Sequence, residues 1–100
     1  MSSTYALRWR SVSPEAILWR EWNSEVVVRN ERSGSTHLLG PLAGRVLQIL
    51  LEADGALGVA DIAAGLSDSL AAAAAPDRLA AVDEVLSEFK RLGLAESEPR

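Results

Sequence analysis

The stretch Glu25–Leu51, EVVVRNERSGSTHLLGPLAGRVLQILL, contains the change from strand to helix that decides the fold of this chain. It begins with β-branched valines, breaks at Ser33-Gly34 and resumes as a short run, Ser35–Leu39. β-Branched residues favour strands, and glycine accepts the positive φ that a tight turn requires. Pro41 then suits the first position of a helix, where its missing N–H is not needed. The stretch therefore predicts strand, turn, strand and helix with almost no connecting loop.

The sequence before this unit predicts one further strand. Residues 16–22, AILWREW, are expected to form it, and Asn23-Ser24 supplies the turn into the valine-rich strand. Residues 1–14 are expected to begin as a frayed end and to continue as an extended segment that lies along the sheet. Three short strands joined by tight turns are typical of an antiparallel meander.

Apolar residues at helical spacing predict three helices, at 41–53, 59–66 and 77–92. Glycines at 55 and 93 suit the positions just after the first and the last of them. Residues 67–76 contain five consecutive alanines, and both a loop and an extra helical turn remain open there. The order predicts an α+β fold, in which a three-stranded antiparallel meander precedes a winged-helix-like bundle of three helices.

Composition limits the class of protein. With 100 residues, of which 48% are apolar, we expect one globular domain, residues 1–100, with an ordered core at about 7–95. Cysteine is absent, which excludes disulfides and thiolate metal sites and fits a reducing compartment. The chain begins without the apolar region of a signal peptide, and its apolar runs are too short to cross a bilayer. We therefore expect a cytoplasmic protein without a membrane partner.

The charge distribution argues against nucleic acid as the partner. Residues 1–45 carry six Arg against four Glu, whereas residues 46–100 carry four basic against ten acidic side chains. In a winged-helix DNA-binding regulator, which is the main alternative function, helix 77–92 would read the major groove. The outward residues of that helix include four carboxylates, and these would repel DNA phosphates. They are Asp77, Asp83, Glu84 and Glu88.

The residue types needed for catalysis or metal binding do not come together in this sequence. His37 is the single histidine and has no second His or Cys with which to form a zinc site. Neither a G-x-S-x-G turn nor a glycine-rich phosphate loop is present. The pair Asp83-Glu84 falls on the polar face of a helix, where solvation is the expected role. We predict a non-catalytic protein without cofactor or metal.

The three tryptophans allow two interpretations. Trp9, Trp19 and Trp22 lie among arginines, and aromatic and basic residues together can stack on and neutralise single-stranded nucleic acid. The chain also has a single Phe, so its core between sheet and helices needs large side chains. Packing in the core or on the sheet is the interpretation that we favour.

In several of these segments the chain resembles the PqqD-like proteins, also called RiPP recognition elements, which are winged-helix-like domains that bind leader peptides for modifying enzymes. The resemblance covers about residues 7–95. It is nearest to the PqqD-family peptide chaperones of gene cassettes that also encode an HPr-kinase-related protein. Relatives usually have Leu-Asn where this chain has Leu39-Gly40, so a side chain that could cap the first helix is missing. The resemblance is carried by Trp19-Arg-Glu-Trp22, Val26-Val-Val, Ser33-Gly-Ser-Thr-His-Leu-Leu39 and Pro41-Leu-Ala43.

The resemblance implies that a leader peptide adds as a strand to the edge of the third strand and packs against the last helix. A free strand edge offers unpaired N–H and C=O groups, and nearby pockets select side chains. On the third strand the implied contacts are Ser35, Thr36, His37, Leu38 and Leu39; on the last helix they are Leu79, Val82, Asp83, Leu86 and Lys90. For the apolar helix residues, together with Phe89, plain core packing is the competing role. Asp83 and Lys90 flank that apolar arc, and a solvated surface role is equally open for them.

The partners implied in this way are a precursor peptide and a modifying enzyme from the same gene cluster. A free strand edge also invites pairing with a second copy of the chain, so a homodimer, or a structural subunit, is a third hypothesis.

Overall fold

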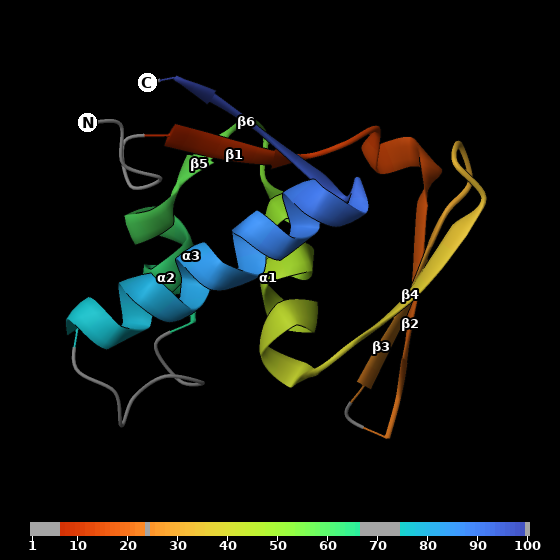
Figure 1. Ribbon diagram of the computed structural model, residues 1–100, viewed down its shortest axis with the longest axis horizontal. Helices are drawn as coiled ribbons and strands as arrows, with labels where there is room; N and C mark the ends of the chain where they lie inside the picture. The colour runs from red at the N-terminus through yellow and green to blue at the C-terminus, as the bar shows by residue number, and fades with distance from the viewer. Residues whose placement is uncertain (1–6, 24, 67–74, 100) are drawn as a thin grey trace.

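The computed structural model describes residues 7–23, 25–66 and 75–99 (Figure 1). This part of the chain forms three α-helices and two antiparallel sheets of three strands each. In chain order the elements are β1 (Leu7–Ser11), a 3-10 turn (Pro14–Ala16), β2 (Ile17–Trp22), β3 (Glu25–Asn30), β4 (Ser35–Leu39), α1 (Pro41–Glu52), β5 (Leu57–Gly58), α2 (Val59–Gly65), α3 (Ala75–Leu92) and β6 (Ala95–Pro99). The α+β expectation is confirmed, and part of the 67–76 segment, residues 67–74, lies outside the described residues.

The predicted meander is the sheet β2-β3-β4. Val28 lies at its centre, opposite Trp19 on one side and His37 on the other. Asn23, with a φ of 50°, lies in the turn from β2 to β3, and Gly34, with a φ of 76°, ends the turn into β4. Both residues are types that accept a left-handed backbone. Since β3 is the middle strand, β4 lies at an edge of this sheet.

The second sheet departs from the sequence expectation. β1 does not lie along the meander; it is the central strand between β5 and β6. Arg8 is opposite Gly58 on one side and Glu98 on the other. The segment Ala95–Pro99, AESEP, contains no β-branched or aromatic residue, so its sequence carries no strand signal. It becomes a strand because α3 returns the chain alongside β1.

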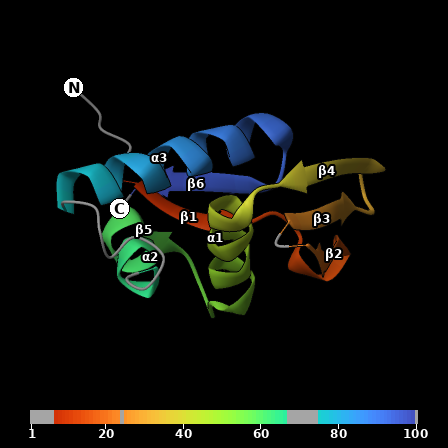
Figure 2. The same cartoon turned by 90° about the horizontal axis from the view of Figure 1, so that it is seen from below.

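Helix α1 lies at the centre of the molecule, where it contacts β1, β3, β4, α2 and α3 (Figures 1 and 2). The core that surrounds it is apolar and closely packed. Its largest fully buried side chains are Trp9, Phe89, Leu47, Ile62, Leu66, Leu86, Leu94, Val28, Val46, Val59 and Val82. α1 ends at Glu52, with Ala53 extended beyond it, so Gly55 is not the helix stop that the sequence predicted.

Helix α3 ends as predicted, at Leu92, with Gly93 just after it. Gly93 has a φ of 78°, its N–H donates to Lys90 O at 3.3 Å, and the N–H of Leu94 donates to Phe89 O at 2.8 Å. This pair of hydrogen bonds is a Schellman motif, which satisfies carbonyls that the end of a helix leaves free. The chain then turns directly into β6.

Asn30, at the end of β3, connects the meander to the end of α3. Its side chain is buried, its Nδ2 donates to Gly93 O at 3.3 Å, and its Oδ1 accepts from the backbone N–H of Arg32 at 2.9 Å. One amide therefore holds both the β3–β4 turn and the C-terminal end of α3. In Figure 2 this end of α3 reaches the side of β4.

Candidate functional site: a groove between β4 and α3

A groove of about 380 Å³ lies between the edge strand β4, the start of α1 and one side of α3. Its floor and walls are mostly apolar, with two carboxylates on the α3 side. The lining residues are Leu39, Leu42, Ala43, Ala81, Glu84, Val85, Glu88 and Phe89. A concave apolar surface with a few polar groups is the usual form of a binding site.

The helix spacing explains why these α3 residues share one side. Ala81, Val85 and Glu88 follow one another at intervals of four and three residues, so their side chains form one row along the helix. Phe89 is fully buried at the base of this row, and Glu84 and Glu88 are exposed at its rim. The row lies opposite Leu39, Leu42 and Ala43, which are on the strand and on the first turn of α1.

The strand wall of the groove has a free backbone edge. Among the strands of the described residues β4 pairs with β3 alone, so the N–H and C=O groups on its other side have no partner within the sheet. Its side chains alternate: Leu39 is buried, Ser35 and His37 are partly buried, and Thr36 and Leu38 are exposed on the outer face. His37 Nε2 lies 3.1 Å from Ser35 Oγ. A strand added here would place every second side chain on the α3 side.

The five strand residues inferred from the sequence make up β4, and of these Leu39 lines the groove; the five inferred helix residues do not line it. Val82 and Leu86 are 0% exposed and belong to the core, and Leu79 packs against that core. Lys90 is turned away, because its Nζ lies 3.3 Å from Ser97 Oγ of β6. Asp83 lies two turns before Lys90 on that same flank.

The groove residues that sequence reasoning missed are Leu42 and Ala43 on α1 and, on α3, Ala81, Glu84, Val85 and Glu88. An amphipathic helix has two flanks beside its apolar arc, and a single sequence does not tell which of them faces a given strand. The helical spacing does restrict the choice to two rows, one with Asp83 and Lys90 and the other with the four missed α3 residues. In the structure the second row lines the groove, while Lys90 of the first row lies beside Ser97 of β6.

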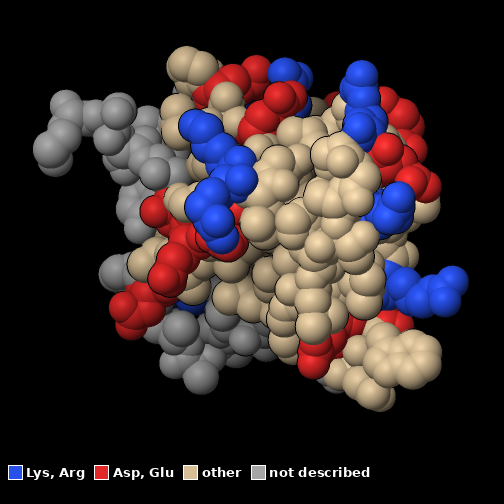
Figure 3. Space-filling view, turned by 45° about the vertical axis from the view of Figure 1, so that its right-hand side comes forward, with Lys and Arg blue, Asp and Glu red and all other residues tan. Residues whose placement is uncertain are grey.

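The outer face of the meander is a second apolar surface. Large hydrophobic side chains are exposed there, including Trp22 at 67% and Leu38 at 66%. Beside them is a shallow hollow of about 560 Å³, lined by Leu18, Trp19, Arg20, Trp22, Val27 and Arg29. Figure 3 shows a broad uncharged surface with charged side chains around its margin.

This surface corrects the expectation for the tryptophans. Trp9 is 1% exposed and belongs to the core, whereas Trp19 and Trp22 are exposed. Trp9 is on β1, which is covered by the helices, while the other two are on β2, at the outer edge of the meander. The three residues are of one type, so the strand on which each tryptophan lies decides whether it is buried or exposed.

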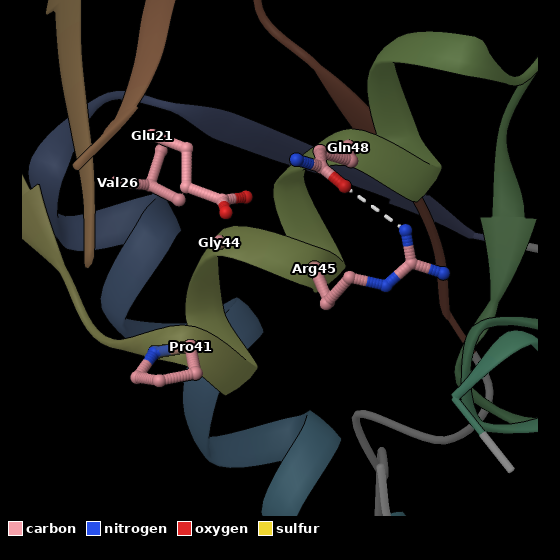
Figure 4. Close-up of a pocket in the computed structure, with 6 residues that line it drawn as sticks. All are labelled: Glu21, Val26, Pro41, Gly44, Arg45 and Gln48. Carbon is pink, nitrogen blue, oxygen red and sulfur yellow. Dashed lines mark hydrogen bonds between the residues drawn. The ribbon is translucent and has the colours of Figure 1, made fainter. Parts of the chain in front are cut away.

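A smaller pocket, of about 200 Å³, lies between α1 and the meander (Figure 4). Its lining includes Glu21, Val26 and Gly44. Arg45 is held along α1, where its Nη1 donates to Gln48 Oε1 at 2.9 Å. The pocket brings together no nucleophile with a base, so its geometry supports no catalytic role.

No three His, Cys, Asp or Glu side chains within residues 7–23, 25–66 and 75–99 are grouped so that they could hold a metal ion. No helix among these residues has the length and apolar character needed to cross a membrane.

No protein-family model matches this chain, and no curated protein matches it. A solved structure described as TbiB1 in complex with the TbiA(beta) leader peptide matches it with a TM-score of 0.63 and 18% sequence identity. The match covers 87% of this chain and 94% of the TbiB1 chain. The two chains therefore share a fold over most of their length, and this supports the fold expected for a RiPP recognition element.

Proposed function

We propose that this protein is a non-catalytic binding protein that captures the leader segment of a precursor peptide in the groove between β4 and α3. The observation that carries the proposal is the free backbone edge of β4 beside an apolar groove. The TbiB1 chain, which has the same fold, was solved with a leader peptide. An extended peptide satisfies both features of this site, since it pairs with the edge and fills the groove.

In this proposal affinity has two sources. Backbone hydrogen bonds to β4 contribute about 0.5–1.5 kcal/mol each and depend little on the peptide sequence. Apolar side chains that enter the groove against Leu42, Val85 and Phe89 contribute about 25 cal/mol for each Å² removed from water. β4 has five residues, so a bound strand of similar length spans about 17 Å. The apolar contacts in the groove, unlike the backbone hydrogen bonds, select among peptide sequences.

We further infer that the bound peptide is presented to a modifying enzyme from the same gene cluster, as in the PqqD-like peptide chaperones. The resemblance at Trp19–Trp22 and at Ser33–Leu39 supports this finer assignment, including the link to cassettes with an HPr-kinase-related protein. When a short segment of the peptide pairs with β4, the parts of the peptide before and after that segment remain in solvent. The part to be modified can then reach a separate enzyme.

The proposal is tested by backbone NMR of the labelled protein during titration with leader peptides encoded beside its gene. Signals of Ser35–Leu39 and of residues 81–89 are expected to shift, and signals of the distant edge strand β2 serve as the internal control. If these peptides leave β4 and α3 unchanged, the proposal is wrong. Salt-dependent binding of duplex DNA centred on α3 would equally contradict it.

A further inference from the structure

We propose that the groove prefers an extended peptide that places an apolar side chain and a lysine or arginine at successive inward-facing positions. This inference rests on the proposed function and adds the chemical class of the ligand. Its basis is the difference between the two walls. The wall made by β4 and α1 contributes only Leu39, Leu42 and Ala43, whereas the α3 wall contributes Glu84 and Glu88.

The spacing of the two carboxylates matches the spacing of side chains on a bound strand. Glu84 and Glu88 are four residues apart on α3, which corresponds to about 6 Å along the helix axis. Side chains on one face of an extended strand recur about every 6.7 Å. Leu39, at the end of β4, lines the same groove as Glu84 and Glu88 of α3. A peptide strand that continues from β4 into the groove therefore brings inward-facing side chains to these two carboxylates.

The two carboxylates are not equivalent. Glu88 is already paired with Arg91, whose Nε lies 3.0 Å from Glu88 Oε2. Glu84 has no ion pair within the described residues and is exposed at the rim. Arg78 lies earlier on α3 and does not line the groove. Glu84 is therefore the carboxylate that is available to a cationic ligand side chain, with Val85 and Phe89 beside it for an apolar one.

The size of the preference follows from the exposure of the rim. Exposed ion pairs contribute little because water and salt screen them, and a preference of about two- to fivefold in Kd is expected. The same screening predicts that the preference decreases as ionic strength rises. A glutamate at the same peptide position is disfavoured by a similar factor, since it faces Glu84 with like charge.

The probe is a set of three synthetic peptides, SLSXSLSXSL, in which X is Lys, Gln or Glu. One face of this strand carries Leu and X in alternation, so in either strand direction there is a register that brings X beside Glu84. Affinities are measured by NMR titration on the wild-type protein, on Glu84→Gln and on Glu52→Gln. Glu52 is exposed at the end of α1, outside the groove, and provides the matched control.

The Lys peptide is expected to bind the wild type two- to fivefold more tightly than the Gln peptide, and the Glu peptide less tightly. Glu84→Gln should remove the difference, and Glu52→Gln should keep it. If the three peptides bind at β4 with equal Kd, or if Glu84→Gln keeps the preference, the inference is wrong and the proposed function stands. If neither these peptides nor the encoded leaders shift the β4 signals, the proposed function fails, and the inference fails with it.

Discussion

Gly44 of α1 lies directly against the side chain of Val26 on β3, with no space for a side chain between them. A Cβ at position 44 would overlap Val26 Cγ2. This approach sets the distance between the central helix and the meander, and the strand next to β3 is β4, which forms one wall of the groove. The packing of α1 and the shape of the candidate site therefore depend on the same contact.

Gly44→Ala is expected to destabilise the protein although alanine is the better helix former. The helical preference favours Ala by about 1 kcal/mol, while overpacking against a buried strand typically costs about 1–3 kcal/mol. We expect a net loss of about 1 kcal/mol in the free energy of unfolding, measured with urea. Gly65→Ala is the matched control, since a Cβ there meets only the flexible end of Ile49. Equal stability of the two variants would show that α1 can move away from β3.

Asn30→Ala is expected to lower the free energy of unfolding by about 2 kcal/mol, because it removes two hydrogen bonds, of about 1 kcal/mol each, made by a buried side chain. Gly93 O loses its donor and the backbone N–H of Arg32 loses its acceptor. Asn30→Asp keeps the acceptor and removes the donor to Gly93 O, so its cost combines the lost link to α3 with the burial of a carboxylate. Chemical denaturation gives both values. Wild-type stability of Asn30→Asp would mean that the Gly93 contact contributes nothing.

Substitutions at Val82 and Val85 are expected to have different effects, because Val82 belongs to the core and Val85 lines the groove. Val82 is fully buried, so Val82→Ala should lower the free energy of unfolding by about 2 kcal/mol through a cavity and lost transfer energy. Val85 lines the groove and is only partly buried, so Val85→Ser should cost less stability and reduce leader-peptide affinity several-fold. Thermal unfolding and peptide titration measure the two effects. A peptide that binds Val85→Ser as tightly as the wild type would remove this side of α3 from the site.

The exposed outer face of the meander is expected to promote self-association. Trp22→Ser and Leu38→Ser should each change the free energy of unfolding by less than about 0.5 kcal/mol, because both side chains are exposed. The double variant should associate less at high concentration, since large exposed apolar patches promote protein–protein association. Light scattering over a concentration series is the measurement. Association that persists in the double variant but disappears when leader peptide is added would instead indicate pairing through the β4 edge.

The pair formed by Glu88 and Arg91 predicts a small acid dependence. The hydrogen bond from Arg91 lowers the pKa of Glu88. The folded-state pKa is thus below the unfolded one, so the stabilisation is present above the usual carboxyl range and is lost as pH falls through the lowered value. Both side chains are exposed, so salt should weaken the effect. Glu88→Gln should remove this part of the stability-against-pH curve, and an unchanged curve would show that the pair contributes nothing.

The elements predicted correctly are those with local causes. Valines in β3, the turn at Gly34, Pro41 at the start of α1 and Gly93 after α3 act on a few neighbouring residues, and the sequence contains them in order. The edge position of β4 also follows locally, because a meander leaves its last strand with one neighbour. For these features short-range conformational preference and long-range packing agree.

The second sheet and the helix side of the groove have no such local cause. Ala95–Pro99 has no strand-forming residues, and it is extended because β1 offers it backbone partners. Both flanks of α3 carry charged residues in sequence, and only the folded chain places Glu84 and Val85 in the groove and Lys90 beside Ser97 of β6. Backbone pairing and helix rotation depend on which distant groups meet, so they are properties of the folded chain and not of any short segment of it.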